Sequence, residues 1–477
     1  MKLFLKCTSV LCLLLVTVTS CYKQKVEMIT TTEKKPWKKV NNFKITSVNE
    51  NAHVVINKND TLQTIEGFGG CFNELGWTSL NLLKETDRQR IMNELFTPGF
   101  GANFTICRMP VGANDFSLDW YSYDETDSDF EMKNFSISND LKTLVPFINE
   151  VQQYAPNLKI WASPWSPPSW MKWNKHYACA IPWEGLDKKY QNNLPADKQG
   201  RESTNMFIQN DEYFKAYSIY FSRFIEEYRK QGIQISMIMP QNEFNSCQIF
   251  PSCTWTAAGL SNFIGKYLGP EMEKQKVEIM FGTMERPSEA LVDTILNDPY
   301  AGKFIKGIGF QWAGKGAIPG LHKRYPNLKI YQTEQECGDG KNDWKFCRYA
   351  WTLMKHYISN GASAYMYWNI SLEEGGISRW GWSQNSLITV NKSEKTFRYN
   401  HEYYLLKHVS HFVKPAAKFL KSSGTFTNLM AFINPDNSLV IVLHNDENID
   451  QNITINTYNM AIDVLLKSDS FNTLIIK

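Results

Sequence analysis

The sequence predicts a parallel (β/α)8 barrel, the TIM-barrel fold, with an attached β-sandwich. Three observations lead to this fold class. Eight short apolar runs alternate with amphipathic helical stretches between residues 64 and 389, two of those runs end in a glutamate, and short alternating runs separated by turn residues fill residues 414–477. Strands that alternate with helices indicate a parallel sheet covered by helices. Short alternating runs indicate antiparallel strands.

The first 20 residues have the pattern of an export signal. Lys2 and Lys6 precede an apolar run, residues 10–18, that is too short to span a bilayer. The run ends in Val18-Thr-Ser-Cys21, which resembles the lipobox of bacterial lipoproteins. We therefore expect lipidation at Cys21 and an exported protein whose only membrane contact is this anchor, on the outer membrane, the cell surface or the periplasmic face. The alternative is a plain secretory signal cleaved nearby.

Two segments separate this signal from the barrel. Residues 21–42 are polar and rich in lysine, a composition that predicts a solvated tether. Residues 43–63 contain two strand-like runs that we expect to join the C-terminal β-sandwich.

The barrel prediction rests on eight runs and on the helices between them. The runs are residues 64–70, 103–110, 158–164, 235–243, 277–283, 305–312, 328–334 and 362–369. Residues 213–228 and 344–360 carry apolar side chains at helical spacing, and a glycine stops each helix. A doubly wound open sheet is the alternative, but Gly67-Phe-Gly-Gly70 lacks the G-x-G-x-x-G spacing of its phosphate-binding turn.

After the eighth run we expect one more helix and then the sandwich. Residues 390–413 are predicted to hold the last barrel helix. Five alternating runs follow within 414–477, at residues 430–434, 439–443, 453–455, 461–465 and 473–476. Their period of two predicts a small antiparallel sandwich.

Composition narrows the function classes. The formal net charge is only +3 and no basic face is clustered, which argues against nucleic-acid binding. Aromatic residues make up 14% of the chain, and flat rings suit stacking against sugars. Cys247 with Cys253, and Cys337 with Cys347, are close enough to bridge loops, with packed free thiols as the alternative. Without paired Cys or His spacing we expect no metal and no cofactor.

Two glutamates end barrel strands and carry the chemistry. Glu243 closes the fourth run and Glu334 the seventh, so both would emerge at the carboxyl face of the barrel. Two opposed carboxylates at that face are what cleavage of a glycosidic bond requires. Glu336 competes with Glu334, because alternate residues of a strand share a face.

Six motifs, in order, resemble those of glycoside hydrolase family 30, the glucosylceramidase-like group. They lie at residues 63–70, 108–117, 162–170, 241–243, 333–334 and 368–376. The resemblance implies a retaining hydrolase in which Glu334 is the nucleophile and Glu243 the acid/base. It also implies that Asn242 bonds the sugar 2-hydroxyl, and that Arg108 and Asp115 bind sugar hydroxyls and orient the carboxylates.

The resemblance extends to aromatic residues, with departures. Trp170, Trp312 and Trp368 would supply stacking faces and a pocket wall, although core packing is the competing role for each. Phe244 stands where the family often has proline, and the loop at residues 245–253 is particular to this chain. Gln311-Trp-Ala313 replaces the His-Trp-Tyr of glucosylceramidases.

The predicted function is a retaining glycoside hydrolase acting on β-glucosidic linkages. An endo-acting β-1,6-glucanase is preferred, because a polysaccharide-degrading branch of the family resembles this chain. An exo-acting β-glucosidase or glucosylceramidase comes second, and a β-xylosidase or xylanase third. The alternative from another class is a non-catalytic glycan-binding lipoprotein, which would lose one carboxylate, whereas both are present here.

Overall fold

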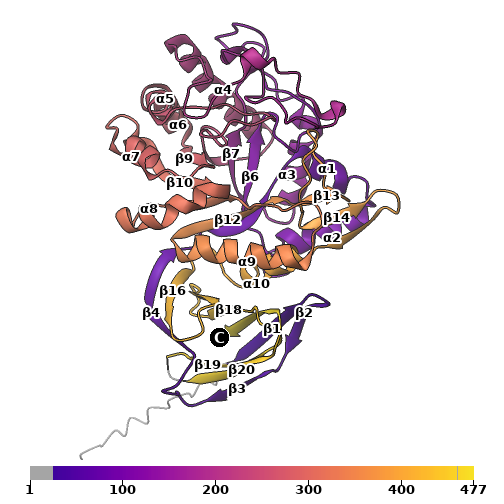
Figure 1. The fold of residues 1–477 in the computed structure, drawn as a ribbon, viewed down its shortest axis with the longest axis vertical. Coiled ribbons are helices and arrows are strands. Elements are labelled where there is room, and N and C mark those ends of the chain that lie inside the picture. The colour runs from indigo at the N-terminus through magenta and orange to yellow at the C-terminus, as the bar shows by residue number, and fades with distance from the viewer. Residues whose placement is uncertain (1–24, 459) are drawn as a thin grey trace, which may run out of the picture.

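Eight parallel strands close into a barrel in the computed structural model, which describes residues 25–458 and 460–477 (Figure 1). Each predicted run overlaps one of these strands, and the strands follow the chain order around the barrel until β12 pairs with β5. The strands are β5 (Gly67–Cys71), β6 (Ile106–Val111), β7 (Lys159–Pro164), β8 (Ile235–Ile238), β9 (Glu278–Met284), β10 (Ile305–Gln311), β11 (Ile330–Glu334) and β12 (Ala362–Asn369). The open-sheet alternative is therefore wrong, because this closure leaves no edge strand.

Helices return the chain between these strands and cover the barrel. They are α1 (Glu74–Leu80), α2 (Glu85–Phe96), α3 (Leu144–Gln152), α4 (Asp211–Lys230), α5 (Ala257–Phe263), α6 (Gly269–Gln275), α7 (Glu289–Asn297), α8 (Ile318–Arg324), α9 (Trp344–Ser359) and α10 (His401–Ser410). The two longest helices, α4 and α9, each begin at a residue whose side chain caps the helix. The side chain of Asn210 caps α4 by accepting from Glu212 N, and that of Asp343 caps α9 by accepting from Phe346 N. The two predicted helices are thus confirmed.

Close packing of β5 on β6 depends on a glycine. A Cβ added to Gly69 would lie 1.8 Å from the backbone oxygen of Ile106. No side chain fits at that distance, so the glycine lets the two backbones approach. The first two motif segments, residues 63–70 and 108–117, are brought together by this contact.

A ten-stranded sheet forms the β domain at the other end of the molecule (Figure 1). Its strands, in spatial order, are β2 (Lys35–Val40), β1 (Val26–Thr32), β21 (Ser470–Ile476), β18 (Leu439–Asn445), β17 (Leu429–Ile433), β16 (Lys418–Ser423), β4 (Val54–Thr64), β19 (Gln451–Asn456), β20 (Ala461–Leu466) and β3 (Phe43–Thr46). The long strand β4 pairs with β16 along most of its length and with β19 at its start. Side chains from strands on either side of β4 in this order, including Met28, Ile441 and Ile455, share one apolar core.

The tether prediction for residues 21–42 is wrong over most of its length. Strand β1 pairs with β21 from Val26 to Thr32, and β2 pairs with β1. Met28 is fully buried, and the ring of Trp37 stacks on Phe412 at 5.8 Å. The lysines misled the prediction because they occupy the exposed positions of β2. A strand whose outward face is lysine has the composition of a solvated segment.

The β domain is attached to the barrel through α9 and α10, which lie between the two in Figure 1. The imidazole of His408 makes hydrogen bonds to Thr473 Oγ1 at 2.8 Å and to Thr31 Oγ1 at 2.7 Å. Burial lowers the pKa of His408 to about 3. This imidazole therefore stays neutral and joins α10 to two strands of the β domain.

The segment after β12 also differs from the prediction. Residues 390–413 were predicted to hold the last barrel helix, and α10 lies within them at His401–Ser410, but strands and not helix precede it. A small three-stranded sheet precedes it, made of β13 (Ser371–Glu373), β14 (Ile388–Asn391) and β15 (Thr396–Tyr399). The turn between β14 and β15 interrupts any helix there. The loop between β13 and β14 carries Trp382 and Gln384, which line a cavity together with Glu243 and Glu334.

The predictions about disulfides and membrane attachment have separate outcomes. Cys247, Cys253, Cys337 and Cys347 are all free thiols, so neither proposed disulfide forms. The export signal and Cys21 lie outside the described residues. Within the described part of the chain, no helix combines the length and apolarity needed to cross a bilayer.

Because β1 and β2 are strands of the β domain, we expect their removal to lower the stability of the protein. Removing residues 1–40 should lower the melting temperature by roughly 5 °C or more, because it deletes β1 and β2 and uncovers the core beside Met28. Removing residues 1–24 is the matched control and should leave the melting temperature unchanged. Thermal unfolding followed by circular dichroism tests both. Equal melting temperatures for the two truncations would mean that the strands contribute no stability.

Candidate active site

Glu243 and Glu334 lie together at the carboxyl face of the barrel. Glu334 is the last residue of β11, and Glu243 follows the end of β8. The backbone of Glu243 has φ of +48°, a conformation that non-glycine residues rarely adopt. The backbone N–H of Glu243 donates a hydrogen bond to the hydroxyl of Thr283 at 2.9 Å, which helps to hold the turn. Unfavourable backbone geometry of this kind gathers at functional sites.

The side-chain amide of Gln311 bridges the two carboxylates. Its Nε2 donates to Glu243 Oε1 at 3.0 Å and to Glu334 Oε2 at 3.1 Å. Because one nitrogen reaches both oxygens, these lie no more than about 6 Å apart, below the roughly 6.5–9.5 Å between the carboxyls of inverting glycosidases. The Oε1 of Gln311 accepts from the hydroxyl of Thr333, which fixes the orientation of the amide.

Three donors surround the carboxylate of Glu334. Arg108 Nη1 donates to Oε2 at 2.9 Å, beside the bond from Gln311, and Trp312 Nε1 donates to Oε1 at 3.0 Å. Burial raises the pKa of Glu334, while the Arg108 guanidinium acts in the opposite direction. A carboxylate with a cation and two further donors is set to remain ionised.

Glu243 has a different environment. Among the described residues, its carboxylate receives only neutral amide donors, from Gln311 and from Gln248 Nε2 at 3.1 Å. Burial raises the pKa of Glu243 well above its usual value, and the charges of Glu334 and Glu285 raise it further. The proton of the pair therefore belongs on Glu243.

Arg108 and Asn242 are buried beside the two glutamates, behind the residues that line the cavity. Arg108 is fully buried, and its Nη2 donates to Asn242 Oδ1 at 2.6 Å. That oxygen also accepts from Gln311 and Thr283. The three donors fix the amide of Asn242, so its Nδ2 is the atom left to meet a sugar hydroxyl. Arg108 contacts the carboxylate and the amide, which makes it a positioning residue.

Asp115 and Trp368 hold polar atoms that lack partners. Asp115 lines the cavity beside both glutamates and is 4% exposed. Its Oδ1 and the Nε1 of Trp368 are buried without a hydrogen-bond partner among the described residues. Burial, and then the charge of Glu334, raise the pKa of Asp115 well above its usual value. A buried polar atom without a partner is costly, and a sugar hydroxyl in the cavity would satisfy Asp115. Trp368 does not line the cavity: it is fully buried and its ring stacks on Trp165 at 5.1 Å. Its predicted role as a stacking face or pocket wall is therefore wrong, and it packs in the core behind Asp115.

Of the remaining predicted site residues, some lie at the cavity and others do not. Trp312 lines the cavity, but Trp170 does not, because its indole donates to the backbone oxygen of Asp124 and its ring packs on Phe130. Trp170 is therefore a core residue, and its predicted role in substrate binding is wrong. Glu336 turns away and pairs with Lys315 at 2.6 Å. The competition between Glu334 and Glu336 is thus decided by where β11 ends.

Sequence reasoning missed several residues of the cavity. Besides the predicted groups, its lining includes Gln248, Phe250, Glu285, Trp382 and Gln384. Most follow strands by several residues, on loops whose path no short motif specifies. For Gln248 and Phe250, the loop particular to this chain was the available signal. The cavity measures about 110 Å³.

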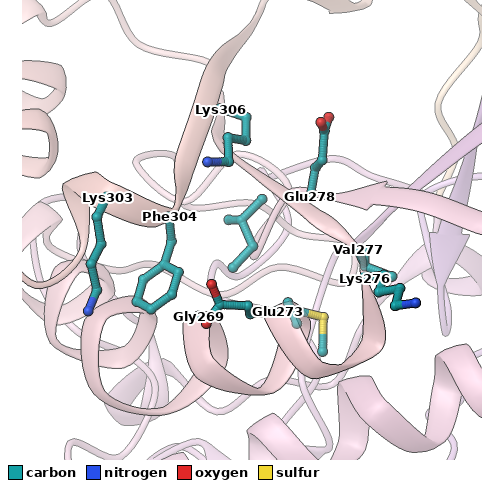
Figure 2. Close-up of a pocket in the computed structure, with 10 residues that line it drawn as sticks. Gly269, Glu273, Lys276, Val277, Glu278, Lys303, Phe304 and Lys306 are labelled. Carbon is teal, nitrogen blue, oxygen red and sulfur yellow. The ribbon is translucent and has the colours of Figure 1, made fainter.

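A larger cavity of about 360 Å³ lies at the opposite end of the barrel (Figure 2). Glu278 at the start of β9 and Lys306 near the start of β10 line it, together with Lys276, Lys303 and Phe304. The carboxyl ends of strands carry the chemistry in barrels of this kind, so the smaller cavity is the candidate active site. Among the described residues, no group of His, Cys, Asp and Glu is arranged to hold a metal ion.

We expect replacement of Glu285 to shift the pH dependence of kcat/KM. The groups facing Glu243 include Glu334, Glu285 and Asp115, and Arg286 pairs with Glu285. Replacing Glu285 by Gln removes a negative charge that raises the pKa of Glu243. Activity that needs protonated Glu243 should then be lost at lower pH, so the basic limb of the kcat/KM profile moves toward acid. A profile with an unchanged basic limb would show that Glu285 does not act on this proton.

Together, a parallel barrel and two close carboxylates at its carboxyl face define a glycoside hydrolase. Comparison with known proteins identifies the family. A model described as "Glycosyl hydrolase family 30 TIM-barrel domain" matches residues 65–413, and one for the family 30 "beta sandwich domain" matches residues 420–474. The chain belongs to glycoside hydrolase family 30.

Individual relatives agree with this assignment. The chain is 29% identical to "Putative glucosylceramidase 1" of Caenorhabditis elegans, over 82% of this chain and 76% of that protein. It is 27% identical to "Endo-1,6-beta-D-glucanase neg1" of Aspergillus fumigatus, over 82% and 80%. The crystal structure of SrfJ from Salmonella typhimurium has the same fold, with a TM-score of 0.82, 24% identity and coverage of 94% and 99%.

Proposed function

We propose that this protein is a retaining β-glycosidase that cleaves β-glucosidic linkages. The observation that carries the proposal is the Gln311 bridge, which limits the two carboxylate oxygens to about 6 Å, near the roughly 5–5.5 Å of retaining enzymes. That spacing leaves no room for a water between Glu334 and the sugar. The carboxylate itself therefore attacks.

The reaction has two displacements. In the first, Glu334 attacks the anomeric carbon, the glycosidic C–O bond breaks, and the leaving oxygen takes the proton of Glu243. In the second, Glu243 takes a proton from water, the water oxygen bonds to the anomeric carbon, and the ester to Glu334 breaks. Glu243 regains its proton, Glu334 regains its charge, and the product keeps the β configuration.

For substrate we propose β-1,6-glucan, cleaved internally. Supporting this choice is the likeness to the Aspergillus fumigatus protein named as an endo-1,6-β-glucanase. The likeness to putative glucosylceramidases favours a second candidate, an exo-acting β-glucosidase. Both candidates use the same cavity for the sugar that is cleaved, and they differ in what lies outside it.

Product analysis separates these candidates. The protein lacking residues 1–21 is incubated with β-1,6-glucan, β-1,3-glucan, xylan and an aryl β-glucoside, with Glu334→Gln as the inactive control. A ladder of β-1,6-linked oligosaccharides that disappears in the control is the expected result. Glucose alone, or turnover of the aryl glucoside with every polymer intact, would favour the exo-acting enzyme. Xylo-oligosaccharides would contradict the glucan assignment.

We also propose that the protein is exported and anchored through a lipid on Cys21. Support comes from the signal-like first 20 residues and the Val18-Thr-Ser-Cys21 pattern. Only residues 22–25 separate this cysteine from strand β1, so the anchor would hold the β domain close to the membrane. Mass spectrometry of the mature N-terminus tests the proposal. A Cys21→Ala variant should leave the membrane fraction, and an unmodified mature N-terminus would contradict it.

A further inference from the structure

Two tryptophans extend the active-site cavity onto the surface. Trp382 lines the cavity with both glutamates, and its ring lies 5.8 Å from that of Trp183. Trp183 belongs to the long connection between β7 and α4, and 48% of its surface is exposed. We call this pair, Trp183 and Trp382, the aromatic ledge.

Neighbouring side chains and a tight turn hold Trp382 of the aromatic ledge in place. The ring of Phe250 meets Trp382 edge-on at 5.8 Å, and Phe250 also lines the cavity. The turn that carries Trp382 is closed by Ser378, whose Oγ accepts from Trp382 N at 3.0 Å. Gly381 in that turn has φ of +79°, and a Cβ there would lie 2.8 Å from the ring of Tyr190. Two loops distant in sequence are therefore packed together where they present these rings.

The cavity is too small for more than a part of a glucan. Its volume of about 110 Å³ is well below the roughly 300–1,000 Å³ of pockets that enclose whole ligands. A substrate with several sugars must therefore lie partly outside it. The aromatic ledge begins at the cavity wall and offers ring faces, against which the C–H faces of sugars stack.

We propose that the aromatic ledge is a second sugar-binding subsite, which holds a glucose unit beyond the one in the cavity. This inference rests on the proposed function and specifies its substrate. The planes of Trp183 and Trp382 are tilted by 57°. A flat β-1,4 ribbon cannot lie on both faces, whereas a β-1,6 chain turns freely at its extra C5–C6 bond. The subsite thus favours a bent glucan chain.

The test compares substrates of increasing length. Trp183→Ala should lower the ratio of kcat/KM for β-1,6-linked glucotetraose to that for an aryl β-glucoside by about tenfold, mainly through KM. Trp173→Ala is the matched control, because Trp173 lies on the same connection, is 42% exposed and, in the described chain, forms no ring pair with Trp382.

Direct binding provides a second measurement. In a Glu334→Gln background, Trp183→Ala should weaken binding of β-1,6-linked glucotetraose about tenfold, as followed by calorimetry. An unchanged dissociation constant and an unchanged ratio would overturn the subsite, as would equal losses in the Trp173→Ala control. Hydrolysis of the aryl glucoside that depends on Glu334 reports the glycosidase itself, so its failure is distinguishable from failure of the aromatic ledge.

Discussion

Replacing Glu334 should abolish turnover. We expect Glu334→Ala to lower kcat on the order of 10⁴-fold or more, as loss of a covalent nucleophile does elsewhere. Its carboxylate oxygens already face three donors, so the charge that attacks the anomeric carbon is held in place. Glu336, two residues further along the chain, does not replace it, because that side chain turns away to Lys315.

Rescue by a small anion makes this expectation specific. Azide can occupy the space left by the Glu334 side chain and attack the anomeric carbon from the same face. The product should be the α-glycosyl azide, with inverted configuration, as identified by NMR. Glu336→Ala is the control and should retain most activity. A β-glycosyl azide from Glu334→Ala would contradict the role of Glu334 as nucleophile.

The barrel was predictable because its signals are local. Each strand is an apolar run bounded by turn residues, and Glu334 is the last residue of such a run. The N-terminal strands show where local signals fail. The lysines of β2 resemble a solvated segment, and only pairing with the C-terminal strand β21, more than 400 residues away, makes β1 a sheet strand.

Some residues of the active site could likewise be predicted from the sequence, and others could not. Residues within motifs, such as Asn242 and Asp115, were predictable from their order along the chain. The Gln311 bridge was not, because it depends on how three strands bring their ends together. Trp170 lies within a motif but packs in the core, since motif membership does not fix the direction of a side chain. The cysteines failed for a related reason, because closeness in sequence does not provide disulfide geometry.

Replacing Glu243 should produce a different defect. We expect Glu243→Ala to lower kcat/KM for glucan by about 10²–10⁴-fold, the usual contribution of a general acid. An aryl glucoside whose phenol leaves without protonation should lose much less in the first step. Its second step then becomes slow, because no base activates water, so the glycosyl-enzyme should accumulate and KM should fall.

Azide and pH then separate the two glutamates. Azide attacks the glycosyl-enzyme without a base, so Glu243→Ala should yield the β-glycosyl azide, whereas Glu334→Ala should yield the α form. Burial, Glu334 and Glu285 raise the pKa of Glu243, so the wild-type enzyme loses activity as pH rises through that pKa. The variant has no such proton, and its basic limb should disappear. Retention of that limb would mean that another group donates the proton, and Glu285 would then be the next carboxyl to replace.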